Sequence, residues 1–286
     1  MCLIVFDWQP DAAASDADRP VPFPLLTLAA NRDEFFHRET EPLHWWENLE
    51  SLESEPQVLA GRDLTGGGTW LGVTRDGRFA ALTNYRAPAE VRPNAPTRGT
   101  LVSDFLSGAP VAPMAYLDAV ARDGHRYNGF NLVVGDFTRG ELAWYGNRAD
   151  APPSLLDPGI HGLSNSLLDT PWPKLVAQRD ALRDLLHVDE RPSLDSLIET
   201  MRNPQLADDH LLPSTGLSLE RERVLSAAFI ESEGYGTRST TALRVVAVDG
   251  DLTLQIKELS DDDGSHNIQR PGAFERSDAF TIVRAA

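Results

Sequence analysis

Met1-Cys2-Leu3-Ile4-Val5-Phe6 is the stretch from which the rest of the sequence can be interpreted. Cys2 is the only cysteine among 286 residues, and removal of Met1, which the small Cys2 side chain permits, would make it the first residue. It would then carry a thiol with a pKa of about 8.5 and an α-amine with a pKa of about 7.7–8.0. A nucleophile beside its own base is the chemistry of N-terminal nucleophile enzymes. The competing interpretation is an ordinary buried cysteine in a first strand.

The composition argues against several classes of protein. The chain has 43 acidic and 26 basic residues, a net charge of −17, whereas a nucleic-acid partner requires a basic surface. A single cysteine rules out an intrachain disulfide and any multi-cysteine metal site. Only Lys174 and Lys257 are lysines. An acidic surface rich in arginine is typical of proteins that stay soluble at high salt, and it predicts a halophilic source.

No segment predicts targeting or a membrane span. The first apolar run stops at Asp7 without a basic region before it, and the run at 25–30 is far shorter than the ~20 residues of a spanning helix. We therefore expect a soluble, cytoplasmic protein. With 41% hydrophobic residues we expect one domain over 1–286, with surface insertions near 9–22 and 259–272.

Hydrophobic patterning predicts antiparallel strands early, helices in the middle and strands again late, an α+β order. Strands are expected over residues 2–8, 23–30, 69–74, 78–83, 128–137, 141–145, 226–230, 240–248, 252–258 and 279–283. Helices are expected over residues 98–106, 114–121, 172–187 and 193–201, the last capped by Ser193. Residues 42–57 and 204–222 are expected to be irregular.

Four polar clusters interrupt this pattern at strand or turn boundaries. They lie at residues 31–34, 83–86, 161–166 and 233–240. If the first two strands form a hairpin, Cys2 and the cluster at 31–34 lie at the same end of the sheet. The clusters favour a site at that end, with Cys2 at its centre.

The motifs in these clusters carry a family resemblance. They read Asn31-Arg32-Asp33-Glu34, Gly61-Arg62-Asp63-Leu64, Gly67-Gly68-Thr69-Trp70-Leu71-Gly72 and Leu82-Thr83-Asn84-Tyr85-Arg86. Together with Met1-Cys2 they resemble the NRDE family, that of the transport and Golgi organisation 2 protein, from Cys2 to about residue 241. The resemblance implies the fold of the N-terminal nucleophile hydrolases, a four-layer αββα sandwich of two antiparallel sheets flanked by helices.

The resemblance also implies roles for individual residues. Cysteine amidohydrolases that cleave bile-salt or penicillin amides are the nearest chemical analogy, and Cys2 matches their nucleophile. Asn84 matches the asparagine that binds the oxyanion, Asn165 the asparagine that contacts the nucleophile's amine, and Arg238 a late arginine. Those enzymes use Arg-x-x-Asp after the second strand, where this chain has residues 31–34. One register puts Asn31 and Glu34 in those places, and another puts Arg32 there with Asp33 nearby.

Two functions follow as expectations. The first is hydrolysis of a small amide substrate through Cys2, which requires no cofactor. The second is a non-catalytic role in haem trafficking, because eukaryotic members of the family are implicated in moving haem. Its axial ligand would be the Cys2 thiolate or one of the imidazoles of His37, His44, His125, His161 and His187. The sequence has no Cys-x-x-Cys-His attachment motif.

Overall fold

The computed structural model describes residues 2–10, 23–47, 57–260 and 274–284, and these form two antiparallel sheets. The first sheet contains β1 (Cys2–Trp8), β2 (Pro24–Phe35), β10 (Gly159–Leu163), β11 (Glu231–Ser232), β12 (Tyr235–Val248), β13 (Asp251–Ser260) and β14 (Phe274–Ile282). Its order is β10-β1-β2-β12-β13-β14, with β11 paired to β12. The second sheet runs in chain order through β3 (Thr40–Trp45), β4 (Val58–Asp63), β5 (Leu71–Thr74), β6 (Arg78–Asn84), β7 (Phe130–Asp136), β8 (Glu141–Gly146) and β9 (Ser154–Leu155).

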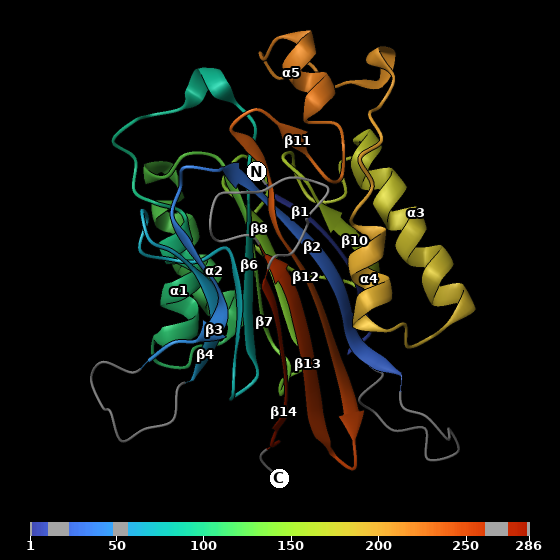
Figure 1. Cartoon of the computed structure of the whole chain (residues 1–286). Coiled ribbons are helices and arrows are strands. Elements are labelled where there is room, and N and C mark those ends of the chain that lie inside the picture. Colours follow the sequence, from blue (N-terminus) through green and yellow to red (C-terminus); the bar gives the residue numbers. More distant parts are fainter. Residues whose placement is uncertain (1, 11–22, 48–56, 261–273, 285–286) are drawn as a thin grey trace.

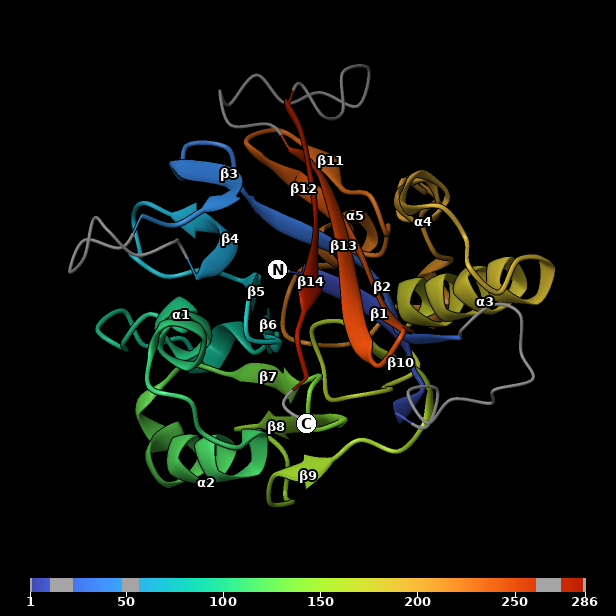
Figure 2. The same ribbon diagram turned by 90° about the horizontal axis from the view of Figure 1, so that it is seen from below.

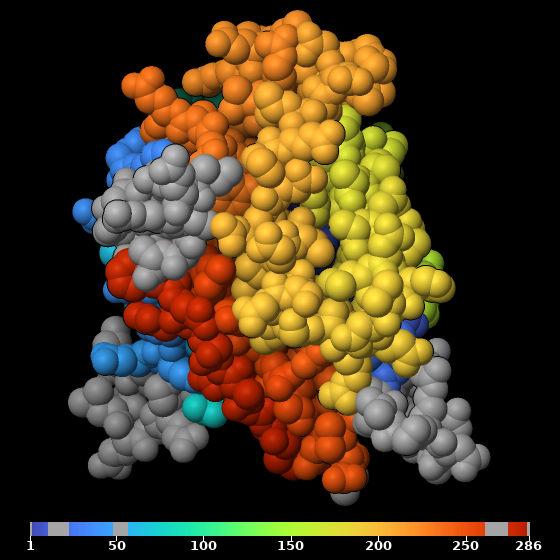
Figure 3. All heavy atoms as spheres, turned by 45° about the vertical axis from the view of Figure 1, so that its right-hand side comes forward, coloured from blue at the N-terminus to red at the C-terminus, as the bar shows by residue number. Residues whose placement is uncertain are grey.

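Helices cover the outer face of each sheet, so the molecule has four layers (Figures 1 and 2). The α-helices are α1 (Gly99–Ser107), α2 (Pro113–Asp123), α3 (Pro173–Val188), α4 (Leu194–Thr200) and α5 (Leu219–Val224). Helices α1 and α2 share an apolar cluster with the second sheet, and α3 and α4 share another with the first. Figure 3 shows α3 and α4, in yellow and amber, lying over one face of the molecule. The expected αββα sandwich is confirmed.

The period of two along β1 decides which layer each of its side chains enters. Leu3 and Val5 pack with α3 and α4, whereas Ile4, Phe6 and Trp8 belong to the large cluster between the sheets. The strand is buried on both faces along its whole length, which explains why its sequence is apolar except at Asp7. β1 and β2 pair antiparallel, as the hairpin prediction required.

Three predictions of local structure are wrong. The polar cluster at 31–34 does not end a strand, because β2 continues to Phe35 with β12 hydrogen-bonded along it. Residues 226–230 are turns and bends, although mostly buried, and form no strand. Part of 42–57 is strand β3, where Pro42 is accommodated at an irregularity in the pairing between Glu41 and His44.

Other predictions hold with small shifts. Ser193 caps α4, its side chain accepting a hydrogen bond from the Ser196 amide. One further prediction is wrong at its end: helix α5 begins within residues 204–222, which were expected to be irregular, and is capped by Ser218. The expected insertions near 9–22 and 259–272 fall almost entirely outside the described residues. No helix among the described residues is both long and apolar enough to cross a membrane.

The triple glycine of the 61–72 region makes a close backbone contact. A Cβ on Gly68 would lie 2.3 Å from the carbonyl carbon of Gly99, whereas a Cβ on Gly67 would meet nothing within 4 Å. Gly67 instead has a φ of +77°. We expect Gly68→Ala to lower the free energy of unfolding by about 1–3 kcal/mol because backbone must move. Gly67→Ala should cost about 1–2 kcal/mol, from strain alone.

Urea unfolding measures both, and the crystal structures of the two variants separate the causes. The Gly68→Ala structure should show the start of α1 displaced, while that of Gly67→Ala should keep α1 in place. An undisplaced α1 in Gly68→Ala would contradict the prediction.

Candidate functional site

Cys2 begins β1, and its side chain faces the space between the two sheets. It follows the alternation in which Leu3 lies under the helices and Ile4 lies between the sheets. Cys2 is only 8% exposed, and it is a free cysteine. Burial raises the pKa of its thiol, Asp33 acts in the same direction and Arg32 opposes both. Within the folded chain the thiol is therefore a poor nucleophile unless something else removes its proton.

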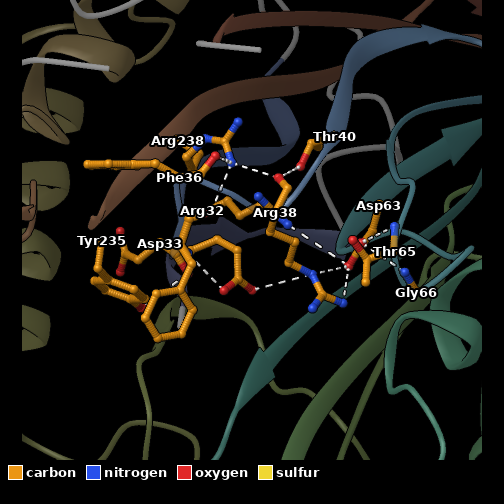
Figure 4. Close-up of polar contacts among 12 residues, drawn as sticks. Arg32, Asp33, Phe36, Arg38, Thr40, Asp63, Thr65, Gly66, Tyr235 and Arg238 are labelled. Carbon is orange, nitrogen blue, oxygen red and sulfur yellow. Dashed lines mark hydrogen bonds and ion pairs between the residues drawn. The ribbon is translucent and has the colours of Figure 1, made fainter. Parts of the chain in front are cut away.

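Arg32 lies directly across the β1–β2 ladder from Cys2. Directly opposed residues in an antiparallel pair have Cβ atoms about 4.5–5.5 Å apart and share one face of the sheet. The Arg32 guanidinium stacks 4.3 Å from the centre of the Trp70 ring, and its Nη2 is 4.0 Å from Oδ2 of Asp63 (Figure 4). Of the two registers left open by the sequence, the structure puts Arg32 beside Cys2. It places a positive charge on the face that carries the thiol.

The Asn31 side chain lies on the opposite face of the first sheet, where it bonds to segments of the helical layer. Its Nδ2 donates to the carbonyls of Met201 and Ala228, both at 2.8 Å, and its Oδ1 accepts from the Thr240 hydroxyl at 2.7 Å. The first two bonds fix the segments after α4 and before β11 onto β2, and the third links β2 to β12. The position of Asn31 fits a structural role, away from the thiol.

Asp33 also lies on the helical face, and there its charge interacts with that of a buried lysine, Lys174. Its Oδ1 accepts a hydrogen bond of 2.7 Å from Thr237, and burial raises the pKa of its carboxyl, with Lys174 opposing that effect. Lys174 is 4% exposed, and its ammonium has no hydrogen-bond partner among the described residues. Burial lowers the Lys174 pKa to about 8, against the attraction of Asp33. The lysine begins the first turn of α3, close enough to Cys2 for the two charges to interact.

Asn165 ties Cys2 to the second sheet. Its Nδ2 lies 3.5 Å from the Cys2 carbonyl oxygen and 3.0 Å from that of Asn84. Asn165 is completely buried just after β10, and Asn84 ends β6. The side-chain amide of Asn84 makes no hydrogen bond to any residue that the structure describes. Three residues singled out from the sequence thus come together from three separate segments.

Glu34 and Arg98 lie on the thiol's side of the first sheet. The Glu34 carboxylate oxygen Oε2 is 3.9 Å from Nε of Arg38. Arg38 also binds Oδ2 of Asp63, through Nε at 2.9 Å and through Nη2 at 2.8 Å. Arg98 precedes α1 and donates to the Gly129 carbonyl at 3.0 Å. Burial lowers the Arg98 pKa, and the nearby charges of Glu34 and Cys2 oppose this.

Arg238 is brought to the turn after β2. Its Nη1 donates to the carbonyls of Phe35 at 3.1 Å, Phe36 at 3.4 Å and Arg38 at 2.8 Å (Figure 4). It occupies the irregularity in β12 between Thr237 and Ser239. These hydrogen bonds hold the β2–β3 turn in place, so the geometry gives Arg238 a structural role at the edge of the site.

A buried ion pair closes the end of the site nearest α5. Arg86 Nη1 lies 2.5 Å from Oε2 of Glu222, and both side chains are almost completely buried. The Arg86 guanidinium stacks 4.8 Å from the centre of the Trp172 ring, and its backbone amide donates to the Asn165 carbonyl at 2.7 Å. The ion pair fixes the position of Arg86, and Arg86 in turn holds the main chain of Asn165.

Sequence reasoning missed four of these residues as site components. They are Arg86, Lys174, Glu222 and Arg98. Two of them could have been noticed in the sequence, because Arg86 ends the motif that contains Asn84 and Lys174 is one of only two lysines. Glu222 lies in a stretch expected to be loop, and nothing near it in the sequence indicated burial.

The raised thiol pKa gives a first test of the site. In the chain that retains Met1, alkylation of Cys2 by iodoacetamide at pH 7 should be at least about tenfold slower than in urea, since burial both blocks access and keeps the thiol protonated. The native rate should still be rising at a pH where that of the unfolded chain has levelled off. Intact mass measures this directly because only one cysteine exists. A native profile that overlays the unfolded one would contradict the burial of Cys2.

Comparison with known proteins gives one matching family and several similar proteins. The family described as Transport and Golgi organisation 2 matches residues 1–259. The "Transport and Golgi organization protein 2 homolog" of Homo sapiens is 34% identical over 276 residues, covering 93% of this chain and 96% of the relative. The "Transport and Golgi organization protein 2" of Drosophila melanogaster is 28% identical, covering 90% and 91%.

Two solved structures are similar at lower levels. One is an N-acylethanolamine-hydrolyzing acid amidase ortholog from Caenorhabditis elegans, with a TM-score of 0.48, 11% identity, and coverage of 85% of this chain and 92% of that one. The other is a mutant conjugated bile acid hydrolase from Clostridium perfringens, with a TM-score of 0.41, 10% identity, and coverage of 100% and 99%.

Proposed function

The chain belongs to the Transport and Golgi organisation 2 family, and from that premise we propose that it is an N-terminal cysteine hydrolase that cleaves a small amide after loss of Met1. The observation that supports this most directly is the Asn165 bridge. The buried side-chain amide of Asn165 holds the main chain of the only cysteine beside the end of β6. There the side-chain amide of Asn84 makes no hydrogen bond to any described residue. An ordinary core cysteine would need no such arrangement.

The proposed reaction begins with the two groups of Cys2. The α-amine takes the thiol proton, and the thiolate attacks the amide carbonyl carbon, forming a carbon–sulfur bond and an oxyanion. The oxyanion accepts a hydrogen bond from Asn84, and loss of such a donor costs about 10²–10³ in rate. The amine then returns its proton to the leaving nitrogen as the carbon–nitrogen bond breaks. Water hydrolyses the resulting thioester and restores the thiol.

The charges around Cys2 suit these steps. Arg32, on the thiol's own face, stabilises the thiolate. Asp33 lies on the other face of β2, under the helices, and its charge interacts with that of Lys174 of α3. There a positive Lys174 disfavours protonation of the α-amine and keeps it available as a base, while Asp33 balances the charge of the lysine.

The test compares two proteins that differ only before Cys2. One begins at Cys2, and the other carries a single glycine in front of it. The first should hydrolyse members of a panel of fluorogenic N-acyl amides, and the second should be at least about 10²-fold slower because its Cys2 nitrogen is a peptide nitrogen and no base. Alkylation of both with iodoacetamide confirms that the thiol is present in each. Equal rates would rule out the α-amine as the base.

Haem handling stays a prediction that rests on the family resemblance. His161 has both ring nitrogens engaged, Nδ1 by Asp169 at 2.8 Å and Nε2 by the Asp157 carbonyl at 2.9 Å. It pairs with Phe6, about 13 Å along β1 from Cys2. Nδ1 of His44 is held by the Pro42 carbonyl at 2.8 Å. The remaining candidates His37, His125 and His187 are surface residues. No described feature favours this function over hydrolysis.

A further inference from the structure

A row of four side chains crosses the first sheet at the level of the thiol. Cys2 pairs with Arg32, Arg32 with Ser239, and Ser239 with Ser260, so the row runs over β1, β2, β12 and β13. All four occupy the face that looks toward the second sheet, because each strand alternates in step with its neighbour. Beyond Arg32 the row contains two serines, the smallest side chains with a hydroxyl.

These small side chains leave a polar cavity between the sheets. Arg32, Ser239 and Ser260 line it from the first sheet, and Trp70 and β3 close it from the second. The space open to the centre of a water-sized sphere is about 10 Å³, enough for one water molecule or one small ion. We call this space the serine cavity.

Three polar atoms at the serine cavity have no partner among the described residues. They are Nη1 of Arg32 and the hydroxyls of Ser239 and Ser260, and each of these residues is 5% exposed. Buried polar groups in folded proteins are almost always hydrogen-bonded, to protein or to a bound species. Three unpartnered donors around one cavity therefore indicate an occupant that accepts hydrogen bonds.

Arg32 brings to the serine cavity a positive charge that its carboxylate partner neutralises only in part. Arg32 and Arg238 both line it, and the nearest carboxylate to Arg32, that of Asp63, is 4.0 Å away and already held by Arg38. Glu258 also lines the cavity, but its two oxygens accept from the Leu43 amide at 2.8 Å and the Thr241 hydroxyl at 3.1 Å.

We propose that the serine cavity is a binding site for one small monovalent inorganic anion of the size of chloride, held by Arg32, Ser239 and Ser260. The guanidinium supplies charge and one N–H donor, and the two hydroxyls rotate to supply the others. A water molecule is the competing occupant, because hydroxyls can also accept. The anion is favoured over water because Arg32 shares its carboxylate partner, Asp63, with Arg38, so that its charge is only partly neutralised among the described residues.

Glu258 couples this site to pH. Burial raises the pKa of its carboxyl to about 7, the bonds from Leu43 and Thr241 oppose that shift, and Arg32 and Arg276 oppose it more weakly. Glu41, at the rim of the cavity, is the other carboxylate that lines it. Below pH 7 Glu258 is mainly neutral and tolerates an anion beside it, whereas above pH 7 it is charged and repels one. Anion affinity should therefore fall as the pH rises through 7.

The test uses chloride and bromide on the full chain. Crystals soaked in bromide should show an anomalous peak between Arg32 Nη1 and the two hydroxyls. In solution, replacing gluconate with chloride at constant ionic strength should raise the melting temperature by about 3 °C or more near saturation, because chloride enters the cavity and gluconate is too large. The double variant Ser239→Ala, Ser260→Ala should lose that response. Ser164→Ala, which removes another buried hydroxyl without a partner, should keep it.

The pH arm has its own control. Chloride should bind at least about fivefold more weakly at pH 8 than at pH 6 in the natural chain. Glu258→Gln, which stays neutral, should bind at pH 8 as tightly as the natural chain does at pH 6. An ordered water without an anomalous peak, or an equal chloride response in the double-serine variant, would overturn the proposal. Neither result would affect the hydrolase proposal, because its nucleophile Cys2 and its oxyanion donor Asn84 do not line this cavity.

Discussion

Replacing Cys2 with alanine is expected to lower amide hydrolysis by at least about 10³-fold, to the background of the assay. The proposed reaction routes bond formation through this one sulfur, and no other thiol exists in the chain to substitute for it. Loss of the nucleophile in another hydrolase that uses covalent catalysis lowers kcat by up to about 10⁶-fold. The measurement is kcat/KM on the best amide of the panel, with protein that begins at position 2.

Two controls make the result decisive. Cys2→Ala should melt within a few degrees of the natural chain, because alanine fits the buried position with a loss of only one sulfur atom. Asn165→Asp should keep the bulk of the side chain while replacing the donor that bridges Cys2 and Asn84 with an oxygen, and it should lose activity by a smaller factor. If Cys2→Ala retains more than a tenth of the activity, Cys2 is not the nucleophile.

The fold was predictable where hydrophobic pattern and turn chemistry agree. The continuous apolar run at β1 and the period of α3 both identify their elements, and Ser193 marks the start of α4. The prediction failed where polar residues are buried. Residues 31–34 looked like a strand end because their sequence is polar, but within β2 Asn31 bonds to the segment after α4 and Asp33 accepts a hydrogen bond from β12. Only the tertiary structure reveals those partners.

Some residues of the site could be predicted from sequence motifs, whereas others depend on tertiary contacts. The motifs singled out Cys2, Asn84 and Asn165, and the structure joins these three residues through one amide. The sequence could not choose between Asn31 and Arg32, because strand register decides which of them shares a face with Cys2. A one-residue slip would exchange the two faces. Lys174 was not identified either, since a lysine in a first helical turn is usually exposed.

The second large effect concerns the ion pair behind Asn165. Arg86→Met should lower the free energy of unfolding by about 3–5 kcal/mol, because it leaves Glu222 charged, buried and without its main counter-ion. Among the described residues, Glu222 would keep its hydrogen bonds from Thr215, whose amide lies 3.1 Å away. Urea unfolding monitored by tryptophan fluorescence measures the loss. The remaining Trp172, now without the stacked guanidinium, also reports on the site locally.

A double variant separates the ion pair from simple loss of packing. Arg86→Met with Glu222→Gln removes both charges and keeps the volume of each side chain nearly constant. It should recover at least half of the stability lost in Arg86→Met, because the cost of the single change is mainly a stranded charge, and well-packed neutral replacements of buried pairs are often close to neutral. If the two single losses simply add, Arg86 acts through packing on Trp172. A recovery would instead show that charge pairing holds the end of β6, and with it Asn84, against α5.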